Sequence, residues 1–431
     1  MFETLKNAWK IADLRKKLLY TAMVIIIFRV GAAIPVPFLE PGALQDMINA
    51  SGSLLGYLDV LTGGAFAQCT LFALSISPYI TSSIVVQLLT IAIPYLERLS
   101  KEGEEGKKKL NKITRYTTVA LAFLQSGAYF IMLKNSNAVL YTEGFSGIFA
   151  AVVIILSFVA GAMFITWLGE QVDQKGIGNG ISMILFAGIV SRGPSMVGKM
   201  WQYLVLAKNG QTRYFVAVPV IAVLFVFVIA FIVLMTEAER RIPVQYAQRV
   251  VGRKMYGGQS THIPIKVNMS GVLPVIFASS LLAIPGTIKG FVDPLETGFW
   301  GKFLGIFDYD HWFYALAYFL LIMAFNYFYV AVQYNPIEIA NNLRKNSGTI
   351  PGIRPGKPTS DFIARVVSKI TFVGGIFLAI IAIMPIFVGA ISKMNIALGG
   401  TTVIIVVGVA LDTVRQLESQ MMMRHYKGFL E

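Results

Sequence analysis

The sequence predicts an all-α membrane protein that crosses the bilayer ten times. Hydrophobic residues make up 55% of the chain and charged residues only 14%, against roughly 25% charged in soluble domains. Nine of ten apolar runs reach the roughly 20 residues that a helix needs to cross a bilayer. Backbone groups in lipid must be bonded within the segment, so these runs are predicted to be helices. They lie near residues 17–36, 71–95, 114–134, 147–168, 177–198, 214–236, 267–288, 312–334, 368–391 and 396–417.

The charges fall mostly on one side of the predicted membrane. If the chain begins in the cytoplasm, the loops and run ends on that side hold 28 Lys+Arg and 15 Asp+Glu, whereas the opposite side holds eight of each. Positive residues resist transfer across a bilayer. This asymmetry predicts an even number of spans with both termini in the cytoplasm, as in a multi-pass protein of the bacterial plasma (inner) membrane.

The fifth run is the weakest of the ten. Four glycines interrupt it, and only about 14 residues precede Arg192. Without this span, the loops 237–266 and 335–369 would lie outside the cell, although each carries six Lys+Arg. The charge pattern therefore favours a fifth span.

On this topology the chain divides into four regions. A cytoplasmic amphipathic N-terminal segment (1–16) precedes an N-terminal half (17–206), a C-terminal half (207–417) and a cytoplasmic C-terminal tail (418–431). Because five spans is an odd number, the second half must be inverted relative to the first. An inverted repeat places the working site at the interface between the halves. The second and seventh predicted helices, near 71–95 and 267–288, share a faint matching signature: Pro78-x-Ile80-x-x-Ser83 and Pro274-x-Ile276-x-x-Ser279.

The stretch between the first two spans is apolar but too short to cross a membrane. It runs from Leu55 to Gln68 and is interrupted by Gly63 and Gly64. One interpretation is a helix that lies on the membrane surface. The other is a half-helix folded back into a cavity, since irregular backbone at membrane depth survives only inside protein or beside water.

Two long basic loops face the cytoplasm. In 237–266, two segments alternate with period two around Gly257 and Gly258, which predicts a protruding β-hairpin. In 335–369, a Pro- and Gly-rich turn displays Arg354. Such charges often form only a solvated face that sets topology. Loops of this length are usually functional, however, so we favour a docking surface for an anionic or acidic cytoplasmic partner.

The sequence contains little that points to catalysis or cofactor binding. A single cysteine, Cys69, excludes an internal disulfide, and His262, His311 and His425 are far apart. There is no phosphate-binding loop, nucleophile elbow or HExxH motif. We therefore expect neither an enzyme nor a cofactor or metal site.

The predicted spans hold almost no acidic residues in their cores. Glu170 and Asp412 fall at span ends, and Asp59 belongs to the non-spanning stretch. Arg29 lies within the first run, where snorkelling of its side chain toward the interface is one explanation for it. Buried charges mark ion and proton paths in carriers, so a proton-coupled carrier is disfavoured. The remaining classes of function are a passive conduit and a machine driven by an external energy source.

Several long motifs resemble the SecY family of bacterial protein-translocation channels, and the resemblance runs from the first span to the tenth. They are LTGGAF (61–66), SPYITSSIVVQLL (77–89), KEGEEG (101–106), WLGEQ (167–171), GIGNGIS (176–182), QSTHIPIKVNMSGVLP (259–274) and PGIRPG (351–356).

The resemblance implies a clamshell of two five-helix halves around an hourglass pore, with a re-entrant plug helix at about 57–69. Plug residues would be Tyr57, Leu58, Leu61, Thr62, Gly63, Gly64 and Phe66. A ring of aliphatic side chains would form the constriction: Ile76, Ile80, Ile181, Leu185, Ile276 and Ile405. A lateral gate between helices 2 and 7 would include Thr81, Ser83, Gln87, Asn268, Ala278 and Ile284. From the residues alone, all six ring residues are also ordinary core residues.

The resemblance also implies partners and a function. The motor ATPase SecA and the translating ribosome would dock on the basic loops, at Arg240, Arg241, Arg249, Arg253, Lys254, Arg354 and Lys357. SecE and SecG would pack around the clamshell within membrane lipid, and signal sequences and nascent polypeptides would be the cargo. The function implied is the central pore of the Sec translocon. Two other classes stay open: a secondary carrier with inverted repeats, and a non-conducting scaffold that recruits ribosomes.

Overall fold

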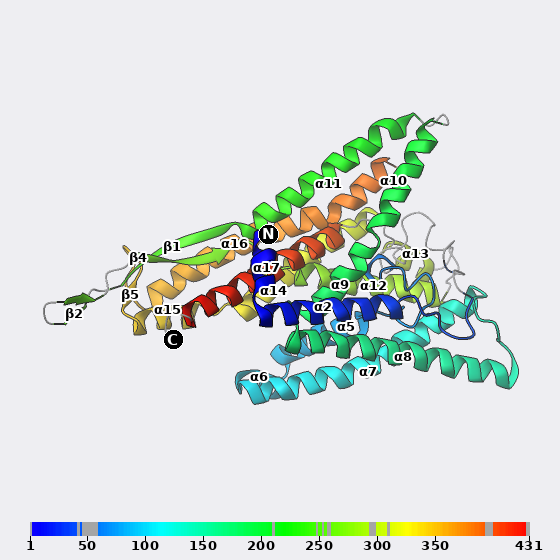
Figure 1. The fold of residues 1–431 in the computed structure, drawn as a ribbon, viewed down its shortest axis with the longest axis horizontal. Helices are drawn as coiled ribbons and strands as arrows, with labels where there is room; N and C mark the ends of the chain where they lie inside the picture. Colours follow the sequence, from blue (N-terminus) through cyan, green and yellow to red (C-terminus); the bar gives the residue numbers. More distant parts are fainter. Residues whose placement is uncertain are drawn as a thin grey trace.

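The computed structural model describes residues 2–40, 44, 59–208, 212–246, 249–251, 254–256, 260–292, 299–307, 311–392 and 400–427. These residues form a bundle of long helices from which a β-hairpin projects at one end (Figure 1). The helices of the first part are α1 (Phe2–Lys10), α2 (Ala12–Gly31), α5 (Ser77–Ala92), α6 (Pro94–Lys101), α7 (Glu104–Asn135), α8 (Gly144–Lys175), α9 (Gly180–Ser191) and α10 (Gly193–Lys208). Those of the second part are α11 (Arg213–Glu237), α12 (Leu273–Val292), α13 (Phe299–Gly305), α14 (Trp312–Gln333), α15 (Pro336–Lys345), α16 (Lys357–Ser392) and α17 (Gly400–Lys427).

Each of the ten predicted runs overlaps a helix, although not all of these helices are long, straight spans. Within the described residues, seven helices are long and apolar enough to cross a membrane, and eight if α5 and α6 form one bent span. α5 ends at Ala92 because Pro94 lacks the N–H that would continue the helix, and α6 departs at 102°. α2 begins in the charged stretch before the apolar run, since Asp13 lies in its first turn.

The fifth span is longer than predicted. It begins at Gly180, where the side chain of Asn179 accepts a hydrogen bond from the Ser182 amide at 3.0 Å. The chain then continues through Arg192 into α10, so that the apolar element covers 29 residues. Two of the four glycines therefore precede the helix, and the other two lie within it. The charge distribution predicted this span better than the length of the apolar run did.

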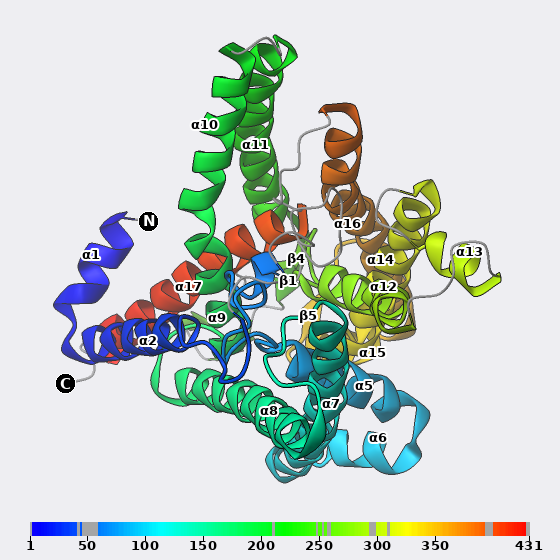
Figure 2. The same cartoon turned by 90° about the vertical axis from the view of Figure 1, so that its right-hand side faces the viewer.

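The helices fall into two groups that meet along α9 and α17. α2, α5, α7, α8 and α9 pack on one another, as do α11, α12, α14, α16 and α17. We call these groups the N-terminal and C-terminal halves. α17 crosses to the other half, where it lies beside α1 and α9 (Figure 2). There Gln416 Oε1 accepts a hydrogen bond from the Gly178 amide at 2.6 Å, and Leu417 packs with Leu14 and Ile177.

The two basic loops form one structure, which the sequence did not predict. Strands β1 (Glu239–Tyr246) and β4 (Ser260–Lys266) make the predicted antiparallel hairpin, with the short pair β2 (Arg249–Val251) and β3 (Lys254–Tyr256) beyond it. β5 (Gly348–Thr349), from the second loop, pairs with the end of β1 to give the strand order β4-β1-β5. Ile242 and Val244 of β1 are buried against residues of α15 and α16, so both loops are held on one apolar core.

A buried polar network joins three helical regions of the C-terminal half. The hydroxyl of Ser270, just before α12, donates to Asn326 Oδ1 on α14 at 2.5 Å. Asn326 Nδ2 in turn donates to the carbonyl of Thr371 on α16 at 2.7 Å. All three residues are buried, so the amide satisfies two partners that have no access to water.

Asn326→Ala is therefore expected to lower the free energy of unfolding by about 1–3 kcal/mol, because it removes the acceptor of the buried Ser270 hydroxyl and the side-chain donor to the Thr371 carbonyl. The measurement is SDS-induced unfolding of the detergent-solubilised protein. Asn341→Ala, at an exposed position of α15, is the matched control. Equal stability of the two variants would contradict the structural role of the network.

Candidate functional site

An apolar cluster at the junction of the two halves is the candidate site. Its buried core is Leu185 and Ile189 from α9 with Ile405 and Val409 from α17. Ile80 of α5, Ile276 of α12 and Leu61 of the connection between α2 and α5 pack against it, among others. Two helices of each half, and a segment that belongs to neither set of spans, thus converge on one point. We call this set the junction cluster.

The predicted ring is divided between two clusters. Ile80, Leu185, Ile276 and Ile405 meet in the junction cluster. Ile76 is fully buried in a neighbouring cluster inside the N-terminal half, where Ile181 and Ile80 pack against it. Ile80 therefore belongs to both clusters and connects them. Four of the six predicted residues come together directly, and Ile76 and Ile181 lie on the N-terminal side of that group.

The matching motifs of helices 2 and 7 occupy matching places. Pro78 lies in the first turn of α5 and Pro274 in the first turn of α12, and the isoleucines two residues later both reach the junction cluster. α5 and α12 also contact each other. A sequence signature of only three residues therefore marks equivalent positions around the junction.

The predicted gate residues lie at different depths along these two helices. Four intervening spans make α5 and α12 antiparallel, and Ile80 and Ile276 are at the level of the junction cluster. Thr81, Ser83 and Gln87 then lie on the same side of that level as Asn268, which follows β4, whereas Ala278 and Ile284 lie on the opposite side. Ala278 is fully buried inside the C-terminal half and Ile284 is 48% exposed. Asn268 Oδ1 is buried and has no hydrogen-bond partner among the described residues.

The connection between α2 and α5 is folded into the N-terminal half. Tyr57 and Leu58 of the predicted plug lie outside the described residues. From Asp59 on, the chain makes one short helical turn to Leu61 and then a series of turns up to Ile76. We call residues 59–76 the inserted segment. Most of its side chains are buried, which excludes the surface-loop interpretation for the described part.

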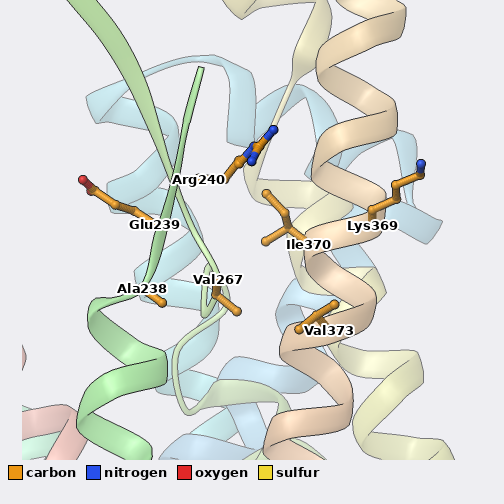
Figure 3. Close-up of a pocket in the computed structure, with 7 residues that line it drawn as sticks. All are labelled: Ala238, Glu239, Arg240, Val267, Lys369, Ile370 and Val373. Atoms are coloured by element: carbon orange, nitrogen blue, oxygen red, sulfur yellow. The ribbon is translucent and has the colours of Figure 1, made fainter. Parts of the chain in front are cut away.

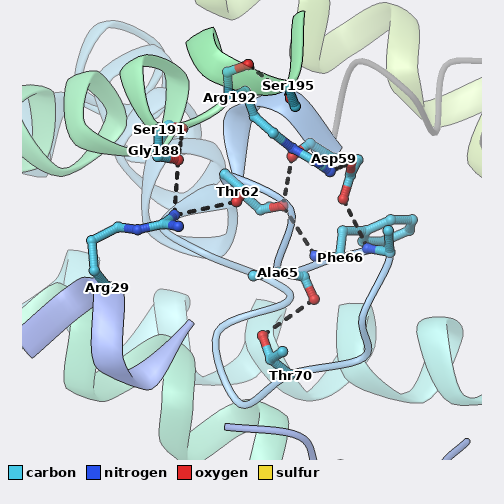
Figure 4. A network of polar contacts seen from close by, with 12 residues as sticks. Arg29, Asp59, Thr62, Ala65, Phe66, Thr70, Gly188, Ser191, Arg192 and Ser195 are labelled. Atoms are coloured by element: carbon cyan, nitrogen blue, oxygen red, sulfur yellow. Dashed lines mark hydrogen bonds and ion pairs between the residues drawn. The ribbon is translucent and has the colours of Figure 1, made fainter. Parts of the chain in front are cut away.

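Local hydrogen bonds explain why the inserted segment adopts turns. Asp59 Oδ1 accepts from the Ala67 amide at 2.8 Å, and the Thr62 hydroxyl accepts from the Phe66 amide at 3.1 Å (Figure 4). Gly63 and Gly64 have φ values of 67° and 95°, which favour glycine. Side-chain oxygens thus satisfy backbone amides that a continuous helix would have paired.

Three helices of the N-terminal half hold the inserted segment in place. Arg29 of α2 donates to the Gly63 carbonyl at 3.3 Å, and the Tyr129 hydroxyl of α7 donates to the Phe66 carbonyl at 2.6 Å. Arg192, at the end of α9, forms an ion pair with the buried carboxylate of Asp59. The Arg29 side chain thus has specific partners and does not merely snorkel to the interface.

Sequence reasoning missed this polar set, although a signal for it was present. Arg29, Asp59 and Arg192 each interrupt an apolar stretch. Charges in such surroundings are usually paired with one another, and this rule applied to all three would have predicted contact.

The single thiol of the chain belongs to the inserted segment. Cys69 is fully buried beside Phe66 and Tyr129, and the Tyr129 hydroxyl lies 3.7 Å from Sγ. Burial raises the pKa of the Cys69 thiol, against the opposing effect of the Tyr129 hydrogen bond. The reactive thiolate form is therefore disfavoured while the segment is in place.

The predicted basic docking residues are spread along the hairpin and the second loop. Arg240 and Arg241 are exposed on β1, and Arg241 forms an ion pair with Glu239 at 2.7 Å. Arg249 and Lys254 lie on β2 and β3, and Arg253 lies outside the described residues. Arg354 is exposed in the turn before α16, and Lys357 is exposed as the first residue of α16. The Arg354 carbonyl accepts from the Thr359 hydroxyl at 2.9 Å, which fixes this turn.

A pocket of about 340 Å³ lies apart from the junction cluster, where α11 passes into β1 (Figure 3). Arg240 points toward α16 across this pocket, whereas the ammonium of Lys369 points away (Figure 3). The pocket has a single carboxylate, Glu239, so it holds no acid–base pair of carboxyl groups. It is lined by Ala238, Glu239, Arg240, Val267, Lys369, Ile370 and Val373.

Comparison with known proteins identifies the family. Residues 70–414 match the family model described as SecY. The chain belongs to the SecY family. Over its whole length it is 41% identical to the protein translocase subunit SecY of Thermotoga maritima, covering 98% of that protein. It is 43% identical to the corresponding subunit of Streptomyces griseus, with both chains fully covered.

Solved structures share the fold. A structure described as that of a protein-conducting channel matches with a TM-score of 0.65 at 20% identity, covering 94% of this chain and 92% of the other. Sec61 in a canine ribosome-channel complex from the endoplasmic reticulum matches with a TM-score of 0.61 at 18% identity, with the same coverage. The two five-helix halves are therefore the SecY-family architecture, and the predicted fold class is confirmed.

Proposed function

We propose that this chain is the central pore-forming subunit of a bacterial Sec translocon. It conducts unfolded secretory polypeptides across the plasma membrane and releases transmembrane segments sideways between α5 and α12. The observation that carries the proposal is the junction cluster, where α5 and α9 of one half meet α12 and α17 of the other in a SecY-family chain. This is the place where separation of the halves would open a path.

The chemistry of the junction cluster suits a conduit for chains of any sequence. Branched apolar side chains form a constriction that excludes water and so blocks ions. They offer a passing polypeptide no fixed hydrogen-bonding groups, so they do not select or retain particular sequences. Leu185, Ile276 and Ile405 are of this kind, and Ile80, Ile76 and Ile181 extend the same apolar surface into the N-terminal half.

The inserted segment serves as the plug in this proposal. Leu61 packs against the junction cluster, so the segment closes the path from one side. A secondary carrier would instead need a carboxylate that is free to bind an ion or proton. The buried carboxylate of this region, Asp59, is paired with Arg192 and with the Ala67 amide. The pairing favours a structural role for Asp59.

The proposed partners follow from the cytoplasmic surface and the family. The exposed arginines of β1 and of the turn at Arg354 suit acidic protein or RNA phosphate, to which guanidinium groups bind bidentately. We assign this surface to the motor ATPase SecA and to the translating ribosome. SecE and SecG are the proposed membrane partners of the helices, and signal sequences and nascent chains are the proposed cargo.

Reconstitution tests the function. Vesicles that contain this chain with its SecE and SecG partners, SecA and ATP should protect an unfolded precursor protein from external protease. Vesicles that lack the chain should leave the precursor exposed. Counterflow of small solutes without precursor protection would instead indicate a carrier.

Arg354→Glu is expected to reduce SecA-driven precursor protection at least about tenfold, because like charges across an interface repel. Gly352 and Gly356, with φ values of 79° and 102°, and the Thr359 hydrogen bond hold this exposed turn, so the change should spare folding. Lys134→Glu, an exposed change at the far end of α7, controls for charge alone. Normal SecA-dependent protection by Arg354→Glu would remove the turn from the docking surface.

A further inference from the structure

The inserted segment is attached to the two halves by different kinds of contact. Toward the C-terminal half, Leu61 makes apolar packing against the cluster that contains Ile405. Toward the N-terminal half, the contacts are directional: hydrogen bonds from Arg29 and Tyr129 and the ion pair with Arg192. Apolar packing is non-directional and allows sliding, whereas these polar contacts fix one position. When the halves part, the segment should therefore stay with the N-terminal half.

Among these contacts the ion pair joins two opposite charges, and its carboxylate is nearly buried. The Asp59 side chain is only 6% exposed, whereas that of Arg192 is 32% exposed. One carboxylate oxygen of Asp59 faces Arg192, and the other accepts from the Ala67 amide at 2.8 Å (Figure 4). The Asp59 carboxylate therefore ties the internal fold of the segment to the end of α9.

The backbone around the ion pair leaves room for close approach. A methyl group on Gly64 would lie 2.9 Å from the Arg192 guanidinium carbon, and one on Gly63 would lie 2.9 Å from the Gly188 carbonyl oxygen. A methyl group on Gly188 would lie 2.8 Å from the Leu61 carbonyl oxygen. Glycine on both sides of this contact thus lets the segment lie directly on α9.

A second contact reinforces the same seat at Ser191, the residue directly before Arg192. Ser191 donates to the Gly188 carbonyl at 2.6 Å and accepts from Arg29 at 2.8 Å, while Arg29 also binds the Gly63 carbonyl. Arg29 thereby connects α2, α9 and the segment. Without the ion pair, the Arg29 hydrogen bond to the Gly63 carbonyl would still connect the segment to α2.

We propose that Asp59 and Arg192 are the positioning residues that latch the inserted segment to α9, and that the segment leaves its seat only when this ion pair separates. In the proposed channel, the latch sets how readily the plug is released. That consequence rests on the proposed function, whereas the latch itself does not.

Cys69 is a native reporter for the latch. It is the single cysteine of the chain, belongs to the inserted segment and is buried beside Phe66 against the N-terminal half. A thiol in this position reacts with a maleimide only when the segment lifts, so the labelling rate measures the open population. This measurement needs purified protein in vesicles and no translocation. Ion leak through the same vesicles is a second readout.

The variants distinguish loss of the ion pair from a general destabilisation of the fold. Asp59→Asn keeps an oxygen for the Ala67 amide but removes the charge opposite Arg192. Arg192→Gln leaves a nearly buried carboxylate unpaired, which is the more costly loss because Arg192 can reach water and Asp59 cannot. Arg192→Lys retains the charge. Arg213→Gln, whose arginine lies over the Tyr214 ring at the start of α11, is the matched control.

A latch predicts a specific order of labelling rates. Arg192→Gln should label Cys69 at least about tenfold faster than wild type, since each tenfold in an equilibrium corresponds to ~1.4 kcal/mol. Asp59→Asn should show a smaller increase, and Arg192→Lys should restore most of the protection. The double variant Asp59→Asn/Arg192→Gln should label more slowly than Arg192→Gln alone, because it leaves no unpaired buried charge. Ion leak should follow the same order.

Equal labelling of Arg192→Gln and Arg213→Gln would overturn the latch. If Arg192→Gln does not accumulate in the membrane, Asp59→Asn decides, and labelling no faster than that of Arg213→Gln overturns it. Strictly additive rates in the double variant would also overturn it. If the variants show the predicted order of labelling rates while wild-type vesicles transport no precursor, the proposed function is contradicted and the latch is supported.

Discussion

Leu185→Asn is expected to raise the ion conductance of the resting protein at least about tenfold, because a polar side chain wets an apolar constriction. Leu185 is 5% exposed on α9 and packs with Ile405 of the other half. Burial of an amide without a partner costs about 1–3 kcal/mol, so the amide should draw water into the junction. Single-channel recording in planar bilayers measures the effect directly.

Leu185→Ile is the control for this variant, because it conserves volume and apolar character at the same position. It should leave the resting conductance unchanged. If the asparagine and isoleucine variants conduct equally, the junction cluster does not form the seal. The control also separates a change in polarity from a change in packing.

A disulfide between Gln87→Cys and Asn268→Cys is expected to abolish translocation. Both residues lie on the same side of the level of Ile80 and Ile276, and antiparallel α5 and α12 bring them to similar depth. The background carries Cys69→Ser, which removes the native thiol. A closed bridge, which needs Cα atoms about 4.4–6.8 Å apart, would prevent these helices from separating.

Reduction of this bridge should restore precursor protection, and a longer flexible crosslinker between the same cysteines should inhibit less. Each single-cysteine variant serves as the control for oxidation. A bridged protein that transports normally would show that α5 and α12 need not part. A pair of Thr81→Cys with Ile284→Cys should fail to oxidise, since those residues lie on opposite sides of the junction level.

The sequence by itself determined the fold class and predicted a membrane topology. Lys and Arg resist transfer across a bilayer, so their positions in the loops report orientation without reference to packing. The same rule retained the weak fifth span, which the structure extends to Lys208. Period-two alternation in 237–266 likewise predicted β1 and β4, because strand periodicity is a local property.

The family motifs predicted more residues of the site than residue patterns alone did. Ile80, Leu185, Ile276 and Ile405 were selected by resemblance, since aliphatic residues are the default lining of any packed helix. Their convergence depends on how α9 and α17 cross between the halves, which no local pattern encodes. The predicted gate residues lie at two depths, because equal distance from a motif on antiparallel helices means opposite directions in space.

Only the tertiary structure decided what holds the inserted segment. Arg29, Asp59 and Arg192 are widely separated along the chain, and each interrupted an apolar stretch without a visible partner. Their contacts arise because α2, α7 and α9 surround the segment, and because Gly63, Gly64 and Gly188 allow the backbones to touch. Likewise, β5 joins β1 only after α14 and α15 return the second loop to the first. The sequence determines which groups must avoid lipid, because the free-energy cost of exposure to lipid arises at each residue separately. Which of these groups come into contact is decided by the packing of helices that are distant in the chain.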